Sequence, residues 1–401
     1  MPMFLRKFKH AMYLALVRNI VKISPQPSYM LYAGAGSSKQ LCDFLSHTGV
    51  GKVLIVTDKP LRELGVVDQA VQGLVDAGID IAYYDGVLPD PTYVQVEEGV
   101  AALRAHGSDV VLAVGGGSAI DAAKIIAASS ASDDDPRDWV GFGKVKHEIP
   151  KIYAIPTTSG TGSEATMGAV ISDPVSHEKG VISGATLLPA AAALDPDLIL
   201  GLPAPITAAT GMDALTHGIE AYIGVWERGT RIEHSRAAIK LVFDNLVTAC
   251  NDGGNREARA AMSVAACYAG IAINQVNVGN VHAIAHQLGG KYGIPHGMAN
   301  ALVLPGVLEF CREESQTQLA ELARLVGAGN EGDSEEQLSH AFIQAVRDLR
   351  TAVHLPDHSD KIRAVDYEHI AELALAEGEG YPVPRLLDRD STFAILAQIT
   401  A

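Results

Sequence analysis

The chain has 401 residues, a length that favours two domains over one. Apolar residues make up 48% of it and charged residues 19%, a balance that excludes a globally disordered chain. The formal net charge of −16 argues against a nucleic-acid-binding protein, because such a protein needs a concentrated basic face. The four cysteines lie far apart and form no CxxC pair, so we expect no disulfide framework, no thiolate zinc site and a cytoplasmic location.

Residues 1–23 predict an extra basic amphipathic helix. They contain basic residues and no acidic one, and apolar side chains recur every four residues at Phe4, Phe8, Met12, Leu16 and Ile20. The apolar run 11–17 is far shorter than the roughly 20 residues of a membrane span, so we expect no integral membrane association. We expect this helix to pack on its own domain or on a neighbouring subunit, with peripheral membrane contact as the alternative. Because every motif described below lies from residue 57 onward, the helix is expected to be dispensable for chemistry.

Strands and helices alternate up to about residue 200. The pattern predicts strands at 52–57, 80–84, 109–114 and 152–155, and helices at 61–77 and 94–106. Continuous apolar strands separated by helices are typical of a parallel sheet that is covered on both faces. Beyond residue 203 helical periodicity dominates. We therefore predict an α/β domain at 1–203, which includes the extra helix, and an all-helical domain at 204–401.

A glycine-rich segment, Gly115-Gly116-Gly117-Ser118, joins the predicted strand 109–114 to a helical run. Glycines allow a close approach of the backbone, and a helix N-terminus offers unpaired N–H groups, so the segment suits a pyrophosphate. A simple tight turn is the alternative, since the segment is not the GxGxxG fingerprint of dinucleotide-binding proteins.

Two further segments follow predicted strands and suit a nucleotide. Pro156–Glu164 combines hydroxyls with glycines, which suits phosphate, ribose or carboxamide contacts; a cap on the next helix is the alternative. Asp58 ends the first long strand, where a carboxylate can bind ribose hydroxyls and repel a 2′-phosphate. A cap on the following helix is the alternative for Asp58 as well.

The helical half contains a cluster of metal-ligand residue types. Asp213 and His217 stand four residues apart, and so do His282 and His286, so each pair shares one helix face. Gly289-Gly290 is predicted to end the second of these helices, and His296 follows shortly afterwards. Any one histidine alone could be an ordinary side chain, but an aspartate and several histidines together indicate an Fe(II) or Zn(II) site.

Four segments resemble the iron-dependent (group III) alcohol dehydrogenases: GGGSAIDAAK (115–124), PTTSGTGSEAT (156–166), GMDALTHGIEAY (211–222) and GNVHAIAHQLGGKYGIPHGMANALVLP (279–305). The resemblance covers roughly residues 25–345. It implies an N-terminal dinucleotide-binding domain, a helical metal-binding domain, NAD, and one divalent metal, with Fe(II) expected and Zn(II) as the alternative. It also implies reversible oxidation of a small alcohol to an aldehyde or ketone by a homo-oligomer, a dimer or higher.

The resemblance also implies roles for individual residues. The metal ligands match Asp213, His217, His282 and His296, and His286 matches a residue that lies near the nicotinamide and helps to move the proton. Asp121 matches a residue on the pyrophosphate helix that faces the cofactor, and Asp58 matches the position that favours NAD over NADP. The remaining cofactor contacts match Gly115, Gly116, Gly117, Ser118, Thr157, Thr158, Ser159 and Lys179.

Two regions depart from the family pattern. The helix at 1–23 is longer than usual, and the segment 353–401 is only loosely similar, with Tyr381-Pro-Val-Pro-Arg385 in place of an asparagine–proline–arginine turn. Two rival functions share the architecture: a lyase of the dehydroquinate-synthase type, and a non-catalytic assembly or binding member. The lyase would need a basic cluster for a phosphorylated substrate, and a non-catalytic member would be expected to have lost a ligand or a glycine.

Overall fold

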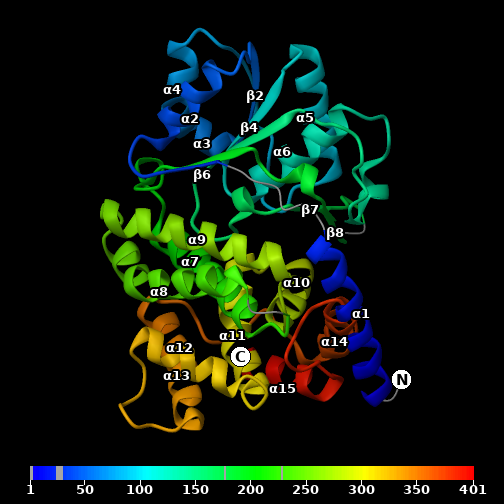
Figure 1. Cartoon of the computed structure of the whole chain (residues 1–401), viewed down its shortest axis with the longest axis vertical. Coiled ribbons are helices and arrows are strands. Elements are labelled where there is room, and N and C mark those ends of the chain that lie inside the picture. Colours follow the sequence, from blue (N-terminus) through cyan, green and yellow to red (C-terminus); the bar gives the residue numbers. More distant parts are fainter. Residues whose placement is uncertain (1–2, 24–29, 176–177, 227–228) are drawn as a thin grey trace. The chain divides into compact units, whose positions relative to one another are not determined.

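The computed structural model describes residues 3–23, 30–175, 178–226 and 229–401 (Figure 1). Its contacts divide the chain into two compact units. The α/β unit consists of Gln26–Leu202 and Gly253–Gly270. The helical unit consists of the N-terminal helix, Pro203–Asp252 and Ile271–Ala401.

A six-stranded parallel sheet forms the centre of the α/β unit, with strand order β1-β9-β6-β4-β2-β3. Its strands are β1 (Met30–Ala33), β2 (Lys52–Val56), β3 (Asp80–Tyr84), β4 (Val110–Gly115), β6 (Lys151–Pro156) and β9 (Ala191–Leu194). The flanking helices are α2 (Ser37–Ser46), α3 (Lys59–Glu63), α4 (Val66–Asp76), α5 (Tyr93–His106) and α6 (Gly117–Ser130).

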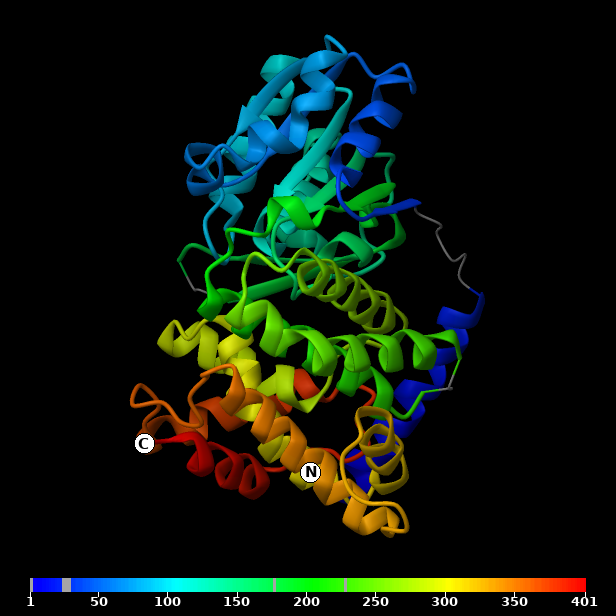
Figure 2. The same cartoon turned by 90° about the vertical axis from the view of Figure 1, so that its left-hand side faces the viewer.

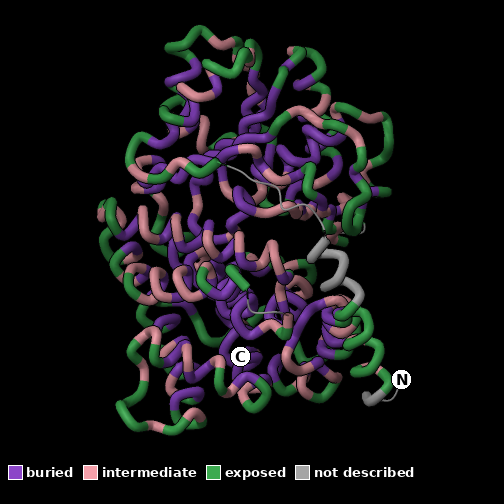
Figure 3. The backbone as a smooth tube through the Cα atoms, in the orientation of Figure 1, coloured by how far each residue is buried: buried purple, intermediate pink, exposed green. Residues whose placement is uncertain are grey.

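The sheet is buried on both faces, as its continuous apolar strands predict (Figure 3). Along β2, Val53 and Ile55 pack with residues of α2 and α4, whereas Leu54 and Val56 pack with residues of α5 and α6. This alternation follows from the two-residue period of a strand. The predicted parallel sheet with flanking helices is therefore confirmed.

Several elements of the α/β unit differ from the prediction. The predicted helix 61–77 is two helices, α3 and α4, because Gly65 between them adopts a left-handed conformation with φ of 74°. Strands β1 and β9 were not predicted, since a strand of four residues gives little periodicity. A second, three-stranded sheet was also missed; it consists of β5 (Gly141–Phe142), β8 (Lys179–Ser183) and β7 (Gly168–Ser172).

After the strands, helices are the main elements of the described residues from Ala204 onward. They are α7 (Ala204–Ile223), α8 (Thr230–Asn251), α9 (Arg256–Val276), α10 (Asn280–Tyr292), α11 (His296–Cys311), α12 (Gln316–Val326), α13 (Glu335–Ala352), α14 (Tyr367–Gly378) and α15 (Arg389–Ile399). The prediction that Gly289-Gly290 ends a helix is wrong. Helix α10 continues to Tyr292 and ends at Gly293, which supplies the left-handed C-cap with φ of 62°.

Domain limits at 1–203 and 204–401 stay a prediction, and the compact units differ from them in two segments. Residues 253–270 belong to the α/β unit, because the first part of α9 packs closely there: a Cβ added to Gly270 would lie 2.5 Å from the carbonyl oxygen of Gly162. The buried Arg259 also donates to the carbonyl oxygen of Leu202, at 2.8 Å. Neither contact leaves a signal in the local sequence pattern.

The second segment is the predicted N-terminal helix, α1 (Met3–Ile23), which belongs to the helical unit (Figures 1 and 2). Its packed face carries Arg6, His10 and Leu14, each one helical turn from the next. Phe8 and Met12, which were expected on the packed apolar face, are 57% and 60% exposed. The packing of α1 therefore depends on polar contacts as well as on apolar burial.

Among the described residues, no single helix combines the length and apolar character needed to cross a membrane. Helices α9 and α10 pass that test only as a pair, and they are bent by 107° at the break between them.

Candidate active site

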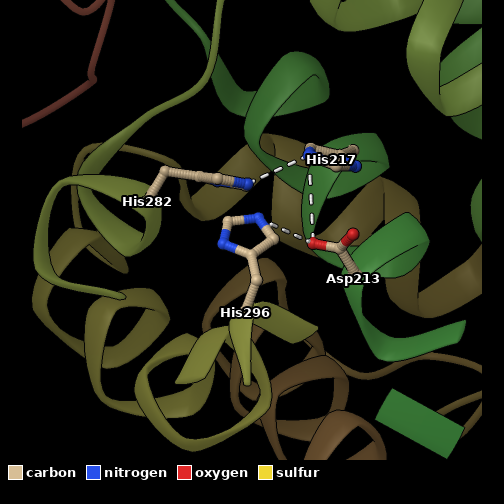
Figure 4. A group of neighbouring side chains, drawn as sticks. All are labelled: Asp213, His217, His282 and His296. Atoms are coloured by element: carbon tan, nitrogen blue, oxygen red, sulfur yellow. Dashed lines mark hydrogen bonds and ion pairs between the residues drawn. The ribbon is translucent and has the colours of Figure 1, made fainter. Parts of the chain in front are cut away.

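Four side chains of the helical unit converge at one point (Figure 4). Asp213 and His217 lie on one face of α7, His282 lies on α10, and His296 is the first residue of α11. Their ligand-type atoms all lie within 4.8 Å of one another. The structure thus brings together all four predicted metal ligands, which lie up to 83 positions apart in the sequence, from Asp213 to His296.

The spacing of these atoms fits a metal ion. Nε2 of His282 lies 3.0 Å from Nε2 of His217, and Oδ1 of Asp213 lies 3.3 Å from Nε2 of His296 and 3.9 Å from Nε2 of His217. Bonds of about 2.0–2.2 Å to a common ion place neighbouring ligand atoms roughly 3–3.5 Å apart. Three imidazoles and one carboxylate are ligands that suit Fe(II) and Zn(II). The donor set and its spacing therefore fit a single divalent metal.

Burial and neighbouring charges shift the pKa values of two of the four side chains. Burial, reinforced by the neighbouring His217 and His296, lowers the pKa of His282 well below its usual value, so this imidazole is neutral. Burial alone would raise the pKa of Asp213, but His217 and His296 outweigh it and hold that pKa below its usual range. The side chain of His296 is 32% exposed, whereas those of the other three are at most 6% exposed. A ligand can therefore approach the cluster from the His296 side.

Glu220 holds one of the four side chains in place and was not singled out from the sequence. Its buried carboxylate accepts from Nδ1 of His282 at 2.6 Å, and from the backbone N–H groups of Gly279 and Val281. A proton on Nδ1 leaves Nε2 of His282 as the acceptor atom that faces the cluster. Glu220 stands seven residues after Asp213 and shares its helix face, a spacing that could have revealed it.

Asn300 is a second residue that the sequence did not reveal. It is fully buried on α11, four residues after His296, and its Nδ2 donates to Oδ1 of Asp213 at 2.7 Å. The same nitrogen lies 3.2 Å from Nε2 of His282 and 3.3 Å from Nε2 of His296. The amide therefore fixes the orientation of the Asp213 carboxylate at the edge of the cluster.

His286 lies beside the four-residue cluster. Its ring stacks on that of His296, with centroids 5.3 Å apart and an interplanar angle of 22°, and it meets the ring of His282 edge-on. Its Nδ1 is 2.6 Å from Oε1 of Glu377. The structure thus places this side chain near the candidate metal site, and its role in proton transfer stays a prediction.

The predicted cofactor segments meet at one edge of the sheet in the α/β unit. Strands β2, β4 and β6 are neighbours, so Asp58, the Gly115–Ser118 loop and Thr157–Ser159 all follow carboxyl ends of parallel strands. A Cβ added to Gly116 would lie 3.3 Å from Oγ1 of Thr158, and one added to Gly115 would lie 4.0 Å from Oδ2 of Asp58. Ligands of open α/β sheets bind at this edge.

The loop between β4 and α6 fits a pyrophosphate. Among the described residues no side chain caps the N-terminus of α6, whose N-cap residue is Gly116, so its first N–H groups are available to an anion. At position 117 there is no room for a larger side chain than that of glycine, since an added Cβ would lie 2.6 Å from Cγ2 of Thr161. These observations favour the pyrophosphate site over a simple tight turn.

Several predicted cofactor residues also have structural contacts. Asp58 caps α3, because its Oδ1 accepts from the N–H of Leu61 at 2.9 Å. The other carboxylate oxygen, Oδ2, lies on the side of the glycine loop. The hydroxyl of Ser159 lies 3.2 Å from that of Ser263 on α9.

Asp121 and Lys179 have other neighbours. The carboxylate of Asp121 accepts from the hydroxyl of Ser163 and from the N–H of Val170, which ties α6 to the segment after β6. Lys179 lies on β8 in the smaller sheet and forms an ion pair with Asp90. Cofactor contacts by these two residues stay predictions.

Comparison with known proteins matches the N-terminal and C-terminal parts of the chain to one family. Residues 28–196 match the iron-containing alcohol dehydrogenase family model, and residues 207–400 match the C-terminal model of the Fe-containing alcohol dehydrogenase family. The 1,3-propanediol dehydrogenase of Citrobacter freundii is 38% identical over 341 residues, which cover 84% of this chain and 88% of that protein. The NAD-dependent methanol dehydrogenase of Bacillus methanolicus is 36% identical over 313 residues, 78% of this chain and 82% of that protein.

A solved structure of a 1,3-propanediol oxidoreductase superposes with a TM-score of 0.90 and 36% identity, covering 94% of this chain and all of that one. The two family matches together span most of the sequence and leave the first 27 residues outside. The chain therefore belongs to the iron-containing alcohol dehydrogenase family.

Proposed function

We propose that this protein oxidises small primary or secondary alcohols to aldehydes or ketones, reversibly, with NAD as hydride acceptor. One observation carries the proposal: four ligand-type atoms on the family's motif positions, those of Asp213, His217, His282 and His296, lie within 4.8 Å of one another. When bound, the metal supplies a Lewis acid that favours loss of the alcohol proton, and NAD accepts the hydride.

The chain's own residues position the reactants and move the proton. The four-residue cluster would hold the metal, and the partly exposed His296 would leave a side of the cluster accessible to the substrate. Gly115–Ser118 and the N-terminus of α6 bind the pyrophosphate, and Asp58 accepts from the adenosine ribose hydroxyls. His286 takes up the alcohol proton, because an imidazole nitrogen without a proton can act as a general base.

The relatives support the proposed substrate class. Those named above act on 1,3-propanediol and on methanol, and a lactaldehyde reductase of Escherichia coli is 36% identical over 348 residues. We therefore propose a small alcohol or diol as substrate, Fe(II) as the metal with Zn(II) as the alternative, a cytoplasmic location and a homo-oligomeric enzyme.

The test is a substrate panel. Protein reconstituted anaerobically with Fe(II) or with Zn(II) is mixed with NAD and with methanol, ethanol, 1,2-propanediol or 1,3-propanediol, and NADH is followed by absorbance. We expect turnover with at least one of these alcohols, and loss of metal and turnover together in His296→Ala. The exposed His369→Ala serves as matched control. Metal-loaded, NAD-binding protein that oxidises no alcohol would contradict the proposal and favour a non-catalytic role.

A further inference from the structure

Glu377, near the end of α14, collects three side-chain hydrogen bonds. Its Oε1 lies 2.6 Å from Nδ1 of His286 and accepts from the hydroxyl of Tyr381 at 2.6 Å. Its Oε2 accepts from Nε2 of Gln287 at 2.7 Å. The side chain of Glu377 is 26% exposed and that of His286 is 20% exposed, so this group is partly shielded from water.

The hydrogen-bonding chemistry of these partners determines which ring nitrogen of His286 carries the proton. Gln287 donates through its amide, and burial together with Glu377 raises the pKa of Tyr381 well above its usual value, so the phenol keeps its proton and donates. A carboxylate that only accepts therefore requires an N–H at Nδ1 of His286. The other ring nitrogen, Nε2, then carries no proton in the neutral ring and is a hydrogen-bond acceptor.

Helix α1 holds the segment that carries Glu377 and Tyr381. The guanidinium of Arg6 donates to the carbonyl oxygen of Leu387 at 2.7 Å and to that of Leu375 at 3.3 Å. Nε2 of His10 donates to the carbonyl oxygen of Tyr381 at 2.7 Å. These bonds reach both sides of Glu377 along the chain, and they come from a helix outside both family matches.

We propose that Glu377 is a positioning residue that fixes the Nδ1–H tautomer and the ring orientation of His286, and that α1 secures the segment from which it acts. The proposal rests on the proposed function only for its catalytic consequence. It replaces the expectation that residues 1–23 are dispensable for chemistry.

The first test reads the tautomer directly. Zn(II)-loaded protein labelled with ¹⁵N-histidine is studied by NMR, and the His286 signals are assigned as those missing in His286→Gln. We expect the wild type to show the neutral Nδ1–H form of His286, and Glu377→Gln to lose that preference, because an amide cannot accept from all three donors. Glu372→Gln removes the same charge at an exposed site on the same helix and should leave the signals unchanged.

The second test measures the catalytic consequence. Losing a carboxylate that orients a histidine typically costs about 10–100-fold, so Glu377→Gln should lower kcat by this factor with metal content and KM unchanged. In a His286→Gln background the same change should cost less than about twofold, because Glu377 acts through His286. Losses that simply multiply in the double variant would overturn the proposal.

The third test addresses α1. The Arg6→Gln, His10→Gln double variant should weaken the His286 tautomer preference and lower kcat, whereas Lys9→Gln on the exposed side of the helix should do neither. A double variant with wild-type NMR signals and turnover would overturn the part assigned to α1. A wild type without the Nδ1–H form would overturn the whole inference, whereas a protein with that form but no alcohol oxidation would overturn only the proposed function.

Discussion

His286 differs from the four cluster residues in what it contacts. Its Nδ1 is engaged by Glu377 and its ring stacks on His296, whereas the ligand-type atoms of the cluster face one another. A catalytic metal keeps at least one position open for substrate, so a fifth protein ligand would compete with the alcohol. The contacts of His286 therefore suit a proton carrier better than a ligand.

We predict that His286→Gln retains the metal and loses about 10²–10⁴-fold in turnover, the usual contribution of general acid–base catalysis. Metal stoichiometry by mass spectrometry and turnover are measured on the same preparation. His282→Gln is the comparison, and it should lose the metal. If the two variants lose the metal equally, His286 is a ligand and the proton-transfer role is wrong.

One carboxylate oxygen of Asp58 caps α3, and the other lies on the side of the glycine loop. We predict that Asp58→Gly raises kcat/KM with NADP relative to NAD, because the variant removes a charge that repels a 2′-phosphate. Glycine is the appropriate replacement, since at an N-cap it costs only a few tenths of a kcal/mol. An unchanged ratio of the two kcat/KM values would show that Asp58 serves the helix alone.

Glu164 is buried in the segment after β6, and burial raises its pKa to about 7. Its unfolded-state pKa lies near 4.5, so between these values the folded state binds more protons. The contribution of Glu164 to the free energy of unfolding is therefore most favourable below pH 4.5. It decreases as the pH rises and is lost above about pH 7, a total change of roughly 3 kcal/mol. We predict that Glu164→Gln loses less stability than the wild type between pH 5 and 8, measured by denaturant unfolding; parallel curves would contradict this.

Among the elements of the α/β unit, α9 and the loop after β6 pack closely at Gly270 and Gly162. We predict that Gly270→Ala destabilises the protein by about 1–3 kcal/mol, because the added methyl would lie 2.5 Å from a backbone oxygen of Gly162. Gly290→Ala on α10 is the matched control: apart from its chain neighbours and the nearby backbone of its own helix, no described atom lies within 4 Å of its added Cβ, so it should stabilise by about 0.5–1 kcal/mol. Thermal melting of both variants decides between these opposite signs.

The long apolar elements could be predicted from the sequence, and the short ones could not. Strands β2, β4 and β6 have five or six residues with nearly continuous apolar side chains, and their positions were predicted to within a residue or two. Strand β9 has only four residues, and three are alanines, which carry little strand preference. The break at Gly65 was missed because one glycine inside a helical pattern is also compatible with an uninterrupted helix.

At the scale of the whole molecule, the candidate metal ligands could be predicted from the sequence, and the residues that support the site could not. Asp213 and His217 share a helix face, so the sequence alone brings them together. The link from Glu377 to His286 joins residues 91 positions apart, in a segment where the family resemblance is weak. The contacts of Arg6 reach 381 positions along the chain. No local period reports such contacts, because they are created by tertiary packing.

Metal binding by the four ligand-type side chains is also expected to stabilise the folded state against unfolding. They come from α7, α10 and α11, and an unfolded chain does not hold them together, so the ion binds chiefly to the native state. Each tenfold rise in free metal above the dissociation constant then adds about 1.4 kcal/mol of stability. We predict that a chelator lowers the melting temperature of the wild type and leaves that of His282→Ala unchanged. If so, the melting temperature measures metal occupancy without any substrate, and chelating buffers shorten the lifetime of the folded protein as well as stopping its turnover.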